Sequence, residues 1–247
     1  MKPKLGKRCL LSAIAGVMPV GLLIGISLAG CAGSEPAKTP AEGPPQPLIT
    51  LSENMPQADE SNLKTPPRVA TGLSPLNPQP AEAALVPGLA VAYFHNYKAR
   101  HLNPLTKGNV PNKEGTPGKP IPYLNHHFGR DEVFDSGTNR LVAMRMRGLL
   151  HFPRTGTYTL LGLSNDGLRI YLDDHLIIDD PAWHARGDQY AVGVVTEIKQ
   201  AGWYPLKVEY NQRKGTAAIA FFWRRPGADG FEPIPAEAYA HIPASGQ

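Results

Sequence analysis

The stretch that decides the fold reads Ser164-Asn165-Asp166-Gly167-Leu168-Arg169-Ile170-Tyr171-Leu172-Asp173. Its first four residues tolerate unusual backbone angles and bond their own main chain, which is typical of a tight turn. The residues that follow alternate between apolar side chains and longer polar or amphipathic ones, the period of two that indicates a half-buried strand. The stretch therefore predicts a turn that leads directly into a β-strand.

Similar short runs, broken by Gly, Pro, Asn and Asp, lie on both sides of this stretch. They predict strands over Leu89–Phe94, Leu141–Phe152, Tyr158–Leu163, Leu168–Leu172, His175–Ile178, Tyr190–Ile198, Tyr204–Tyr210 and Ala217–Trp223. In the long run we expect Val142, Met144 and Met146 on one face and Arg145 and Arg147 on the other. No segment of a dozen residues carries a helical apolar stripe. The predicted fold class is all-β, an antiparallel sandwich or barrel.

Aromatic residues divide the chain into two parts. All 3 Trp, 9 Tyr and 7 Phe lie beyond residue 92, whereas the segment from Ala32 to about Pro87 has none and holds about a dozen of the 26 prolines. Such a segment cannot bury a core. We expect residues 31–87 to form a disordered, Pro-rich tether and residues 88–247 to form the folded domain. At roughly 3.1 Å per residue where it is extended, the tether could reach on the order of 100 Å.

Residues 1–30 have the pattern of a lipoprotein signal peptide. Four basic residues are followed by an apolar run from Cys9 to Leu28 and by Leu28-Ala29-Gly30-Cys31. These last four residues resemble the bacterial lipobox, which implies cleavage before Cys31 and a lipid anchor on it that holds the chain to a membrane. The alternative is a signal anchor, because the apolar run approaches the ~20 residues that span a bilayer. Pro19 and several glycines weaken the run as a permanent helix.

Removal of the leader would change the charge and cysteine content. Four of the 25 Lys and Arg residues lie in the leader, which leaves 21 basic residues against 21 acidic ones. A net charge near zero gives no electrostatic reason to expect a nucleic-acid partner. With Cys9 removed and Cys31 lipidated, we expect no disulfide and no thiol chemistry. Ala32 is not an aspartate, which by resemblance to enterobacterial lipoproteins favours the outer over the inner membrane of the cell envelope.

The order of motifs over residues 88–243 resembles the PA14 (PA-fourteen) domain. This lectin-like β-sandwich is named from anthrax protective antigen and occurs also in yeast flocculins and as insertions in glycosidases. The matching motifs are Arg145–Leu150, Gly156–Leu160, Ser164–Asp173, Leu176–Asp179, Gly202–Tyr210 and Ala217–Trp223. The resemblance implies the fold more strongly than the function, because one fold can host many functions.

The resemblance also implies a calcium site. Sugar-binding members hold calcium through two adjacent aspartates, joined by a cis peptide bond, and an amide side chain from a later loop. The matching positions here are Asn165, Asp166 and Gln212, and all three offer the oxygen ligands that calcium takes. Asn165 replaces an aspartate, so we expect weaker binding. The alternative is that residues 164–167 form a turn that binds no metal.

Trp183 and Arg186 are candidate sugar contacts. Sugars stack on aromatic rings, and polar groups at the rim set their orientation. Both residues lie in an irregular segment, 180–186, that contains a Trp, a His and an Arg. The alternative is that Trp183 plugs one end of the sandwich. We expect Trp203 and Trp223, which lie in or beside strands, to belong to the core.

No arrangement of residues predicts catalysis. Residues 162–166 begin like a nucleophile elbow but lack its final glycine and the strand-to-helix context. The remaining acidic and histidine candidates are expected to be solvated turn carboxylates or structural histidines: Asp173, Asp174, Asp179, Asp180, His126, His127 and His184. We therefore expect a non-catalytic, lipid-anchored envelope protein that binds a glycan or envelope polysaccharide. The alternative is a protein–protein interaction module of an envelope assembly, without metal or sugar binding.

Overall fold

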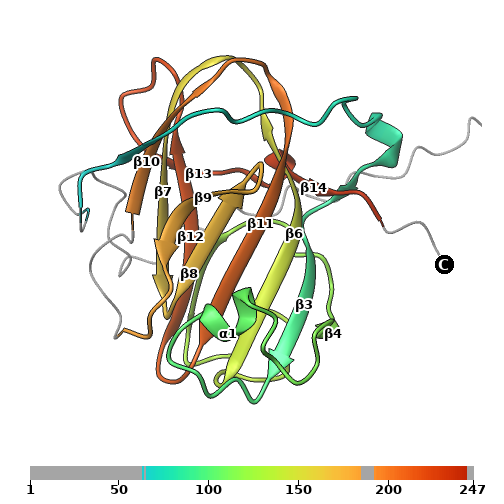
Figure 1. Ribbon diagram of the computed structural model, residues 1–247, viewed down its shortest axis with the longest axis vertical. Coiled ribbons are helices and arrows are strands. Elements are labelled where there is room, and N and C mark those ends of the chain that lie inside the picture. The colour runs from blue at the N-terminus through green and yellow to red at the C-terminus, as the bar shows by residue number, and fades with distance from the viewer. Residues whose placement is uncertain (1–62, 64, 185–191, 244–247) are drawn as a thin grey trace, which may run out of the picture. The chain divides into compact units, whose positions relative to one another are not determined.

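The computed structural model describes residues 63, 65–184 and 192–243. They form two β-sheets packed face to face, so the predicted all-β sandwich is confirmed (Figure 1). Most of the pairings are antiparallel, while β1 and β10 pair in parallel. Among the described residues, no helix is long and apolar enough to cross a membrane. The predicted leader and Cys31 lie outside the described residues.

The first sheet has the order β1-β10-β7-β12-β13, and β5 also pairs with β12. Its strands are β1 (Arg68–Ala70), β10 (Val192–Ile198), β7 (Gly156–Asn165), β12 (Ala217–Arg224), β13 (Glu232–Pro233) and β5 (Asn125–Gly129).

The second sheet has the order β2-β14-β6-β11-β8-β9; β3 pairs with β6, and β4 pairs with β3. Its strands are β2 (Val86–Pro87), β14 (Tyr239–His241), β6 (Val142–Phe152), β11 (Gly202–Gln212), β8 (Leu168–Leu172), β9 (His175–Asp180), β3 (Ala90–His95) and β4 (Thr116–Pro117). Three short helical segments complete the described part: η2 (Glu82–Ala84), α1 (Asn103–Thr106) and η3 (Ala236–Ala238).

The core lies between the two sheets, as the alternating pattern predicts. Val142, Met144 and Met146 of β6 are fully buried, whereas Arg147 is exposed and Arg145 is half-buried on the opposite face. Aromatic rings pack edge to face at one end of this core, with the Phe152 centroid 4.9 Å from that of Tyr158. The predicted division of β6 into a core face and a polar face is therefore confirmed.

The two tryptophans that we expected in the core differ in how deeply they are buried. Trp223 is 2% exposed, which confirms the expectation. Trp203 is only half-buried, and its ring lies 4.8 Å from that of His151 on the outer face of the second sheet. The expectation fails for Trp203 because side chains alternate along a strand, and its neighbour Tyr204 takes the core-facing position.

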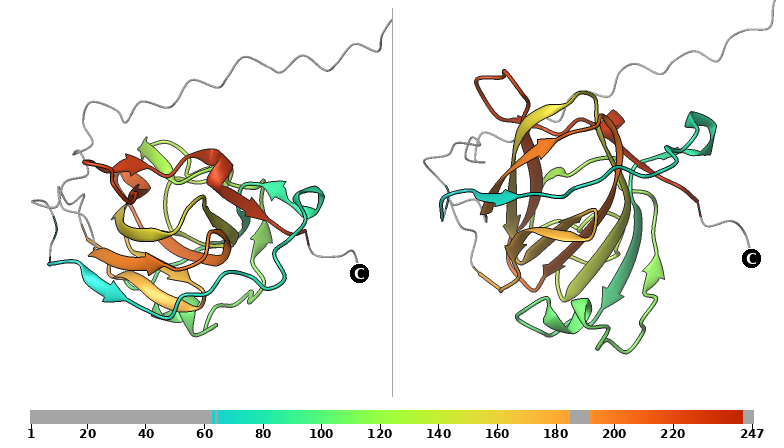
Figure 2. Two further views of the ribbon diagram at one scale, coloured as in Figure 1. Left: turned by 90° about the horizontal axis from the view of Figure 1, so that it is seen from above. Right: turned by 45° about the horizontal axis from the view of Figure 1, so that its top comes forward.

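Residues 65–87, which we expected to belong to the tether, pack against the sandwich instead (Figures 1 and 2). β1 pairs with β10, with Arg68 opposite Val194. The Gln79 side chain accepts a hydrogen bond from the Trp203 backbone amide at 2.7 Å and donates one to the Trp203 carbonyl at 3.2 Å. Backbone pairing and amide bonds of this kind need no aromatic residues, so composition did not reveal them. The boundary at residue 88 is thus corrected to residue 65 or earlier.

Candidate ligand-binding site

The turn at Asn165–Gly167 carries the chain from the first sheet (β7) to the second (β8) and forms a corner at one end of the sandwich. The end of β11 is bonded to it, because the Asp166 amide donates to the Asn211 carbonyl at 3.3 Å and the Asn211 amide donates to the Gly167 carbonyl at 3.0 Å. The Asn165–Asp166 peptide bond is cis, as the resemblance implies. The predicted ligands Asn165, Asp166 and Gln212 are thereby placed at one corner.

Gly167 allows the loop after β9 to approach this corner closely. A Cβ at residue 167 would lie 2.6 Å from the Pro181 carbonyl oxygen and 2.7 Å from Asn211 Oδ1. No other residue type fits there without moving the backbone. The glycine therefore brings the segment that carries Trp183 next to the ends of β7 and β11.

Buried polar atoms without hydrogen-bond partners gather at the corner. Within residues 65–184 and 192–243, these include Asp166 Oδ1, Gln212 Oε1 and both amide atoms of Asn211. Asp166 is 1% exposed, and Asn211 and Gln212 are fully buried. An unsatisfied buried polar group costs about 1–3 kcal/mol, so the corner has the composition of a site that a ligand would satisfy.

Some other polar atoms of the corner have partners. Asp166 Oδ2 accepts a hydrogen bond from the Arg213 backbone amide at 2.7 Å. The Asn165 side-chain nitrogen donates to Thr216 Oγ1 at 3.1 Å, and the Asn165 carbonyl accepts from the Tyr210 hydroxyl at 2.6 Å. The Asn165 amide oxygen is therefore the side-chain atom left for a ligand.

Asn211 is a corner residue that the sequence analysis missed. We assigned the later amide ligand to Gln212 alone, by its place just after the predicted strand that ends at Tyr210. At this end of β11 both amide side chains are buried. The signal that could have identified Asn211 is its place beside Gln212, directly after the Val208-Glu209-Tyr210 run.

Burial also changes the acidity of Asp166. It raises the pKa of the carboxyl from 3.8 to about 6, while the amide bond from Arg213, the positive charge of His184 and the His184 amide oppose the rise. A cation at the corner would favour the ionised form again. Asp166 is thus the residue through which pH and cation binding would be coupled.

The oxygen donors at the corner are of the types that calcium binds. The described residues contain no group of three or more His, Cys, Asp or Glu side chains that could hold a metal. The corner instead offers one carboxylate and the amide oxygens of Asn165 and Gln212, and calcium accepts both kinds of oxygen in a shell of six to eight. One formal negative charge predicts a weaker site than two would.

Trp183 reaches the same end of the sandwich. Its backbone amide donates to the Arg100 carbonyl at 2.7 Å, and the Leu102 amide donates to the Pro181 carbonyl at 2.9 Å. The half-buried Trp183 ring has the Arg213 guanidinium 5.6 Å from its centroid. Trp183 therefore lies beside Arg213, whose backbone amide donates to Asp166 Oδ2. Arg186 lies outside the described residues.

A polar network on the outer face of the second sheet holds α1, which lies at the lower end of the view in Figure 1. Glu209, 1% exposed, accepts hydrogen bonds from Thr106 Oγ1 at 2.6 Å and from Arg145 Nε at 3.3 Å. Arg169 adds a bond from its guanidinium to Thr106 Oγ1 at 2.9 Å. Since α1 follows Arg100 closely in the chain, this network also positions the loop that contacts Trp183.

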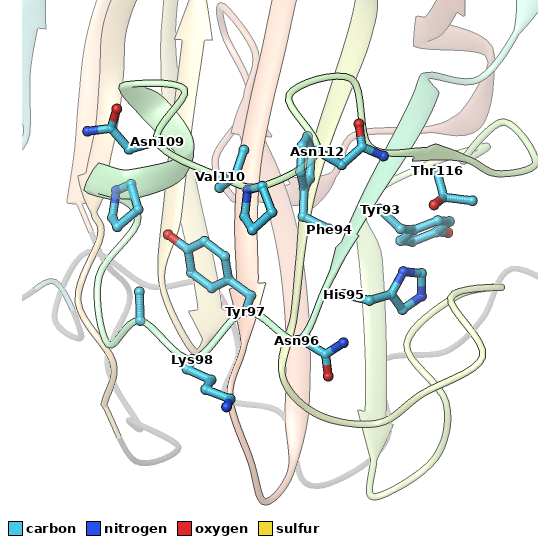
Figure 3. Close-up of a pocket in the computed structure, with 13 residues that line it drawn as sticks. Tyr93, Phe94, His95, Asn96, Tyr97, Lys98, Asn109, Val110, Asn112 and Thr116 are labelled. Atoms are coloured by element: carbon cyan, nitrogen blue, oxygen red, sulfur yellow. The ribbon is translucent and has the colours of Figure 1, made fainter.

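A hollow of about 340 Å³ lies beside the corner, between the end of β3 and residues 104–116 (Figure 3). Its walls include the rings of Tyr93, Phe94 and Tyr97. Backbone hydrogen bonds from the Tyr97 amide to the Leu141 carbonyl and from the Leu141 amide to the Arg213 carbonyl connect it to the corner. The hollow and the corner are therefore linked through the backbone of Leu141.

Three of the four aspartates that we expected to be solvated have partners, and Asp173 is one of them, because it accepts a hydrogen bond from the Ser74 amide at 2.8 Å. Asp173 and Asp174 form the β8–β9 turn with positive φ values of 47° and 57°. Asp179 accepts a hydrogen bond from Arg169 Nε at 2.8 Å, and Asp180 contacts the His184 ring at 3.0 Å. Both side chains are half-buried, because β9 places them beside these basic partners rather than in a free turn.

The fold and the corner define the class, a two-sheet β-sandwich domain with buried, unpartnered polar atoms at one end. Residues 121–237 match the family model of the PA14 domain. The motifs of this chain resemble the same domain over residues 88–243, a range that includes this match. No curated protein matches this chain.

Solved structures share the fold. An anti-sigma factor domain-containing protein aligns with a TM-score of 0.51 and 19% identity, over 65% of this chain and 49% of that one. A second such protein, from Clostridium clariflavum, aligns with a TM-score of 0.50 and 17% identity, over 66% and 49%. A PA14 sugar-binding domain from an RTX adhesin aligns with a TM-score of 0.47 and 14% identity, over 63% and 99%. The aligned part of this chain spans about half the length of the first two proteins.

Proposed function

We propose that this domain is a non-catalytic carbohydrate-binding module, assisted by calcium at the corner. The observation that carries the proposal is the pair of buried oxygens without partners, Asp166 Oδ1 and Gln212 Oε1. Asn165, Asp166 and Gln212 would hold the ion. When bound, calcium supplies open coordination positions that sugar hydroxyl groups can fill.

The chain's own residues have separate roles in this proposal. Asp166 provides the negative charge, and the Arg213 amide fixes its carboxylate through Oδ2. Gly167 has no side chain, and this allows the Pro181 backbone to pack directly against the turn. The hollow beside β3 offers room for further sugar units of a longer glycan.

Binding to immobilised glycans, with and without EDTA, tests the proposal. We expect EDTA and Asp166→Asn each to abolish binding. The matched control is Asp174→Asn, because Asp174 is exposed and lies in the β8–β9 turn at the opposite end of β8. Calcium-independent recovery of one envelope protein, with no glycan bound, would contradict the proposal and support the interaction-module alternative.

We further propose that Cys31 carries a lipid anchor in the cell envelope, at the outer rather than the inner membrane. The Leu28-Ala29-Gly30-Cys31 motif and the Ala32 that follows it support this location. Incorporation of radiolabelled palmitate tests it, with Cys31→Ser as the variant that should lose the label. An unlabelled wild-type chain would contradict the proposal.

A further inference from the structure

Three basic side chains surround the Trp183 ring. The guanidinium carbons of Arg100 and Arg213 lie 5.5 Å and 5.6 Å from its centroid, and the Lys214 ammonium lies 5.9 Å away. Arg100 and Lys214 are exposed, and Arg213 is half-buried. Arg100 lies in the loop after β3, and Arg213 and Lys214 lie in the loop after β11. The two loops are far apart in the sequence, and the fold brings them together. We call Arg100, Arg213 and Lys214 the cationic cluster.

Ion pairs do not account for the positive charge of the cationic cluster in the part of the chain that the structure describes. Within the described ranges, no Asp or Glu forms an ion pair with any of its three members. Asp180 is in contact with His184, and Asp179 is paired with Arg169. Asp166 Oδ2 is held by the Arg213 backbone amide rather than by its guanidinium. An incoming anion would therefore meet basic groups that have no ion-pair partner among the described residues.

Trp183 holds these cations in place. A basic group within about 6 Å of an aromatic centroid is attracted to the ring by about 0.5–2 kcal/mol. Because the guanidinium groups already approach the ring, we assign Trp183 to positioning the cationic cluster rather than to stacking on a sugar. A guanidinium group fixed in this way keeps its donors available for a planar anion.

Resting on the proposed function, we infer that the glycan is acidic, a saccharide whose carboxylate or phosphate group binds the cationic cluster. The Arg213 amide lies 2.7 Å from Asp166 Oδ2, so the residue that carries one charge of the cationic cluster also borders the corner. Hydroxyl groups of the sugar would occupy the corner, and its acidic group would pair with Arg213, Arg100 and Lys214. A neutral sugar would leave the cationic cluster without a partner.

Sugars that differ only at C6 test this inference. Calorimetry of the purified chain in calcium would compare galactose, galacturonate and galactose 6-phosphate, and then the corresponding gluco and manno series. In the series that binds, we expect one or both acidic members to bind about tenfold or more tightly than the neutral member. The difference should shrink as salt is raised, because ions screen exposed charges.

Variants at the cationic cluster test whether its three residues cause the preference for an acidic sugar. Lys214→Gln and Arg100→Gln change exposed side chains and should each reduce the preference for the acidic sugar, and Arg213→Gln should reduce it most. Arg225→Gln is the matched control, since the Arg225 guanidinium lies 6.0 Å from the Trp223 centroid just beyond the far end of β12. Its preference should equal that of the wild type. Thermal unfolding of Arg213→Gln checks that the fold is intact.

The outcomes separate this inference from the proposed function. Tighter binding of the uronate identifies a carboxylate and tighter binding of the sugar phosphate identifies a phosphate; each supports the inference. Equal affinity for neutral and acidic sugars, unchanged in Arg213→Gln, would overturn the inference and leave the proposed function standing. Absence of binding in all three series would overturn both.

Discussion

Asp166 makes the stability of the calcium-free protein depend on pH. Its pKa is about 6 in the folded state, against an ordinary value of 3.8. Between these values the folded chain holds more protons than the unfolded chain, so the free energy of unfolding falls as pH rises from about 4 to 6. A shift of about two units corresponds to roughly 3 kcal/mol. In urea unfolding with EDTA, we expect Asp166→Asn to remove this fall. If the stability of Asp166→Asn fell with pH as steeply as that of the wild type, Asp166 would not be the cause of the fall.

In the proposed calcium site, Asn165 would limit the affinity for the ion, because it replaces a charged ligand with a neutral one. Its side chain is 4% exposed, and Asn165→Asp would add a second carboxylate beside Asp166. We expect calcium affinity to rise about tenfold, because affinity follows the number of charged ligands. Without calcium the variant should be less stable than the wild type, because two adjacent buried carboxylates repel each other. Calorimetry and unfolding in EDTA measure the two effects.

The control for this substitution is Asn109→Asp, which adds the same charge at an exposed position in the loop after α1. It should change calcium affinity far less than Asn165→Asp does. If both variants gained affinity equally, Asn165 would not belong to the ligand set.

Among the structural elements, α1 depends on one buried carboxylate. Glu209→Ala would remove the acceptor for Thr106 and Arg145 and leave the Arg145 guanidinium, 13% exposed, without its ion-pair partner. We expect a loss of about 3 kcal/mol in the free energy of unfolding. Glu197→Ala on β10 is the control, since Glu197 is exposed and should cost at most about 0.5 kcal/mol. A loss below ~1 kcal/mol in Glu209→Ala would show that the network does not hold α1.

The elements that the sequence predicts are those with their own apolar period. β8 coincides with its prediction, and β6 differs by one residue at its start. The missed strands have two to five residues each: β1, β2, β4, β5, β13 and β14. Two of them pair with β12, namely β13 at Glu232–Pro233 and β5 at Asn125–Gly129 with two histidines. These two segments are stabilised by pairing with β12 rather than by a buried stripe of their own. A segment of two to five residues is too short to show a period.

The folded unit as a whole includes residues that composition assigned to the tether. A chain that begins at residue 88 would lose β1, the buried Leu73 and the hydrogen bonds of Gln79 to Trp203. We expect it to be about 2–3 kcal/mol less stable than a chain that begins at residue 65, a Tm lower by roughly 5–10 °C. Calorimetric melting of the two chains measures this. Equal Tm values would contradict the placement of residues 65–87 in the sandwich.

The residues of the candidate site also differ in how far the sequence predicts them. Asn165, Asp166 and Gln212 could be predicted because they stand in motifs that have a counterpart in a known family. The cationic cluster could not, because Arg100, Trp183 and Arg213 lie far apart in the chain. Only the pairing of β11 with β6 and β8, and of the 100–102 segment with residues 181–183, brings them to one end.

Calorimetric titration of calcium into the purified chain tests the central claim most directly. The account predicts one ion per chain, bound with a Kd on the order of micromolar to millimolar. It predicts the same binding in Asp174→Asn and none in Asp166→Asn. Absence of binding in the wild type, or equal binding in Asp166→Asn, would contradict a calcium-assisted site at this corner.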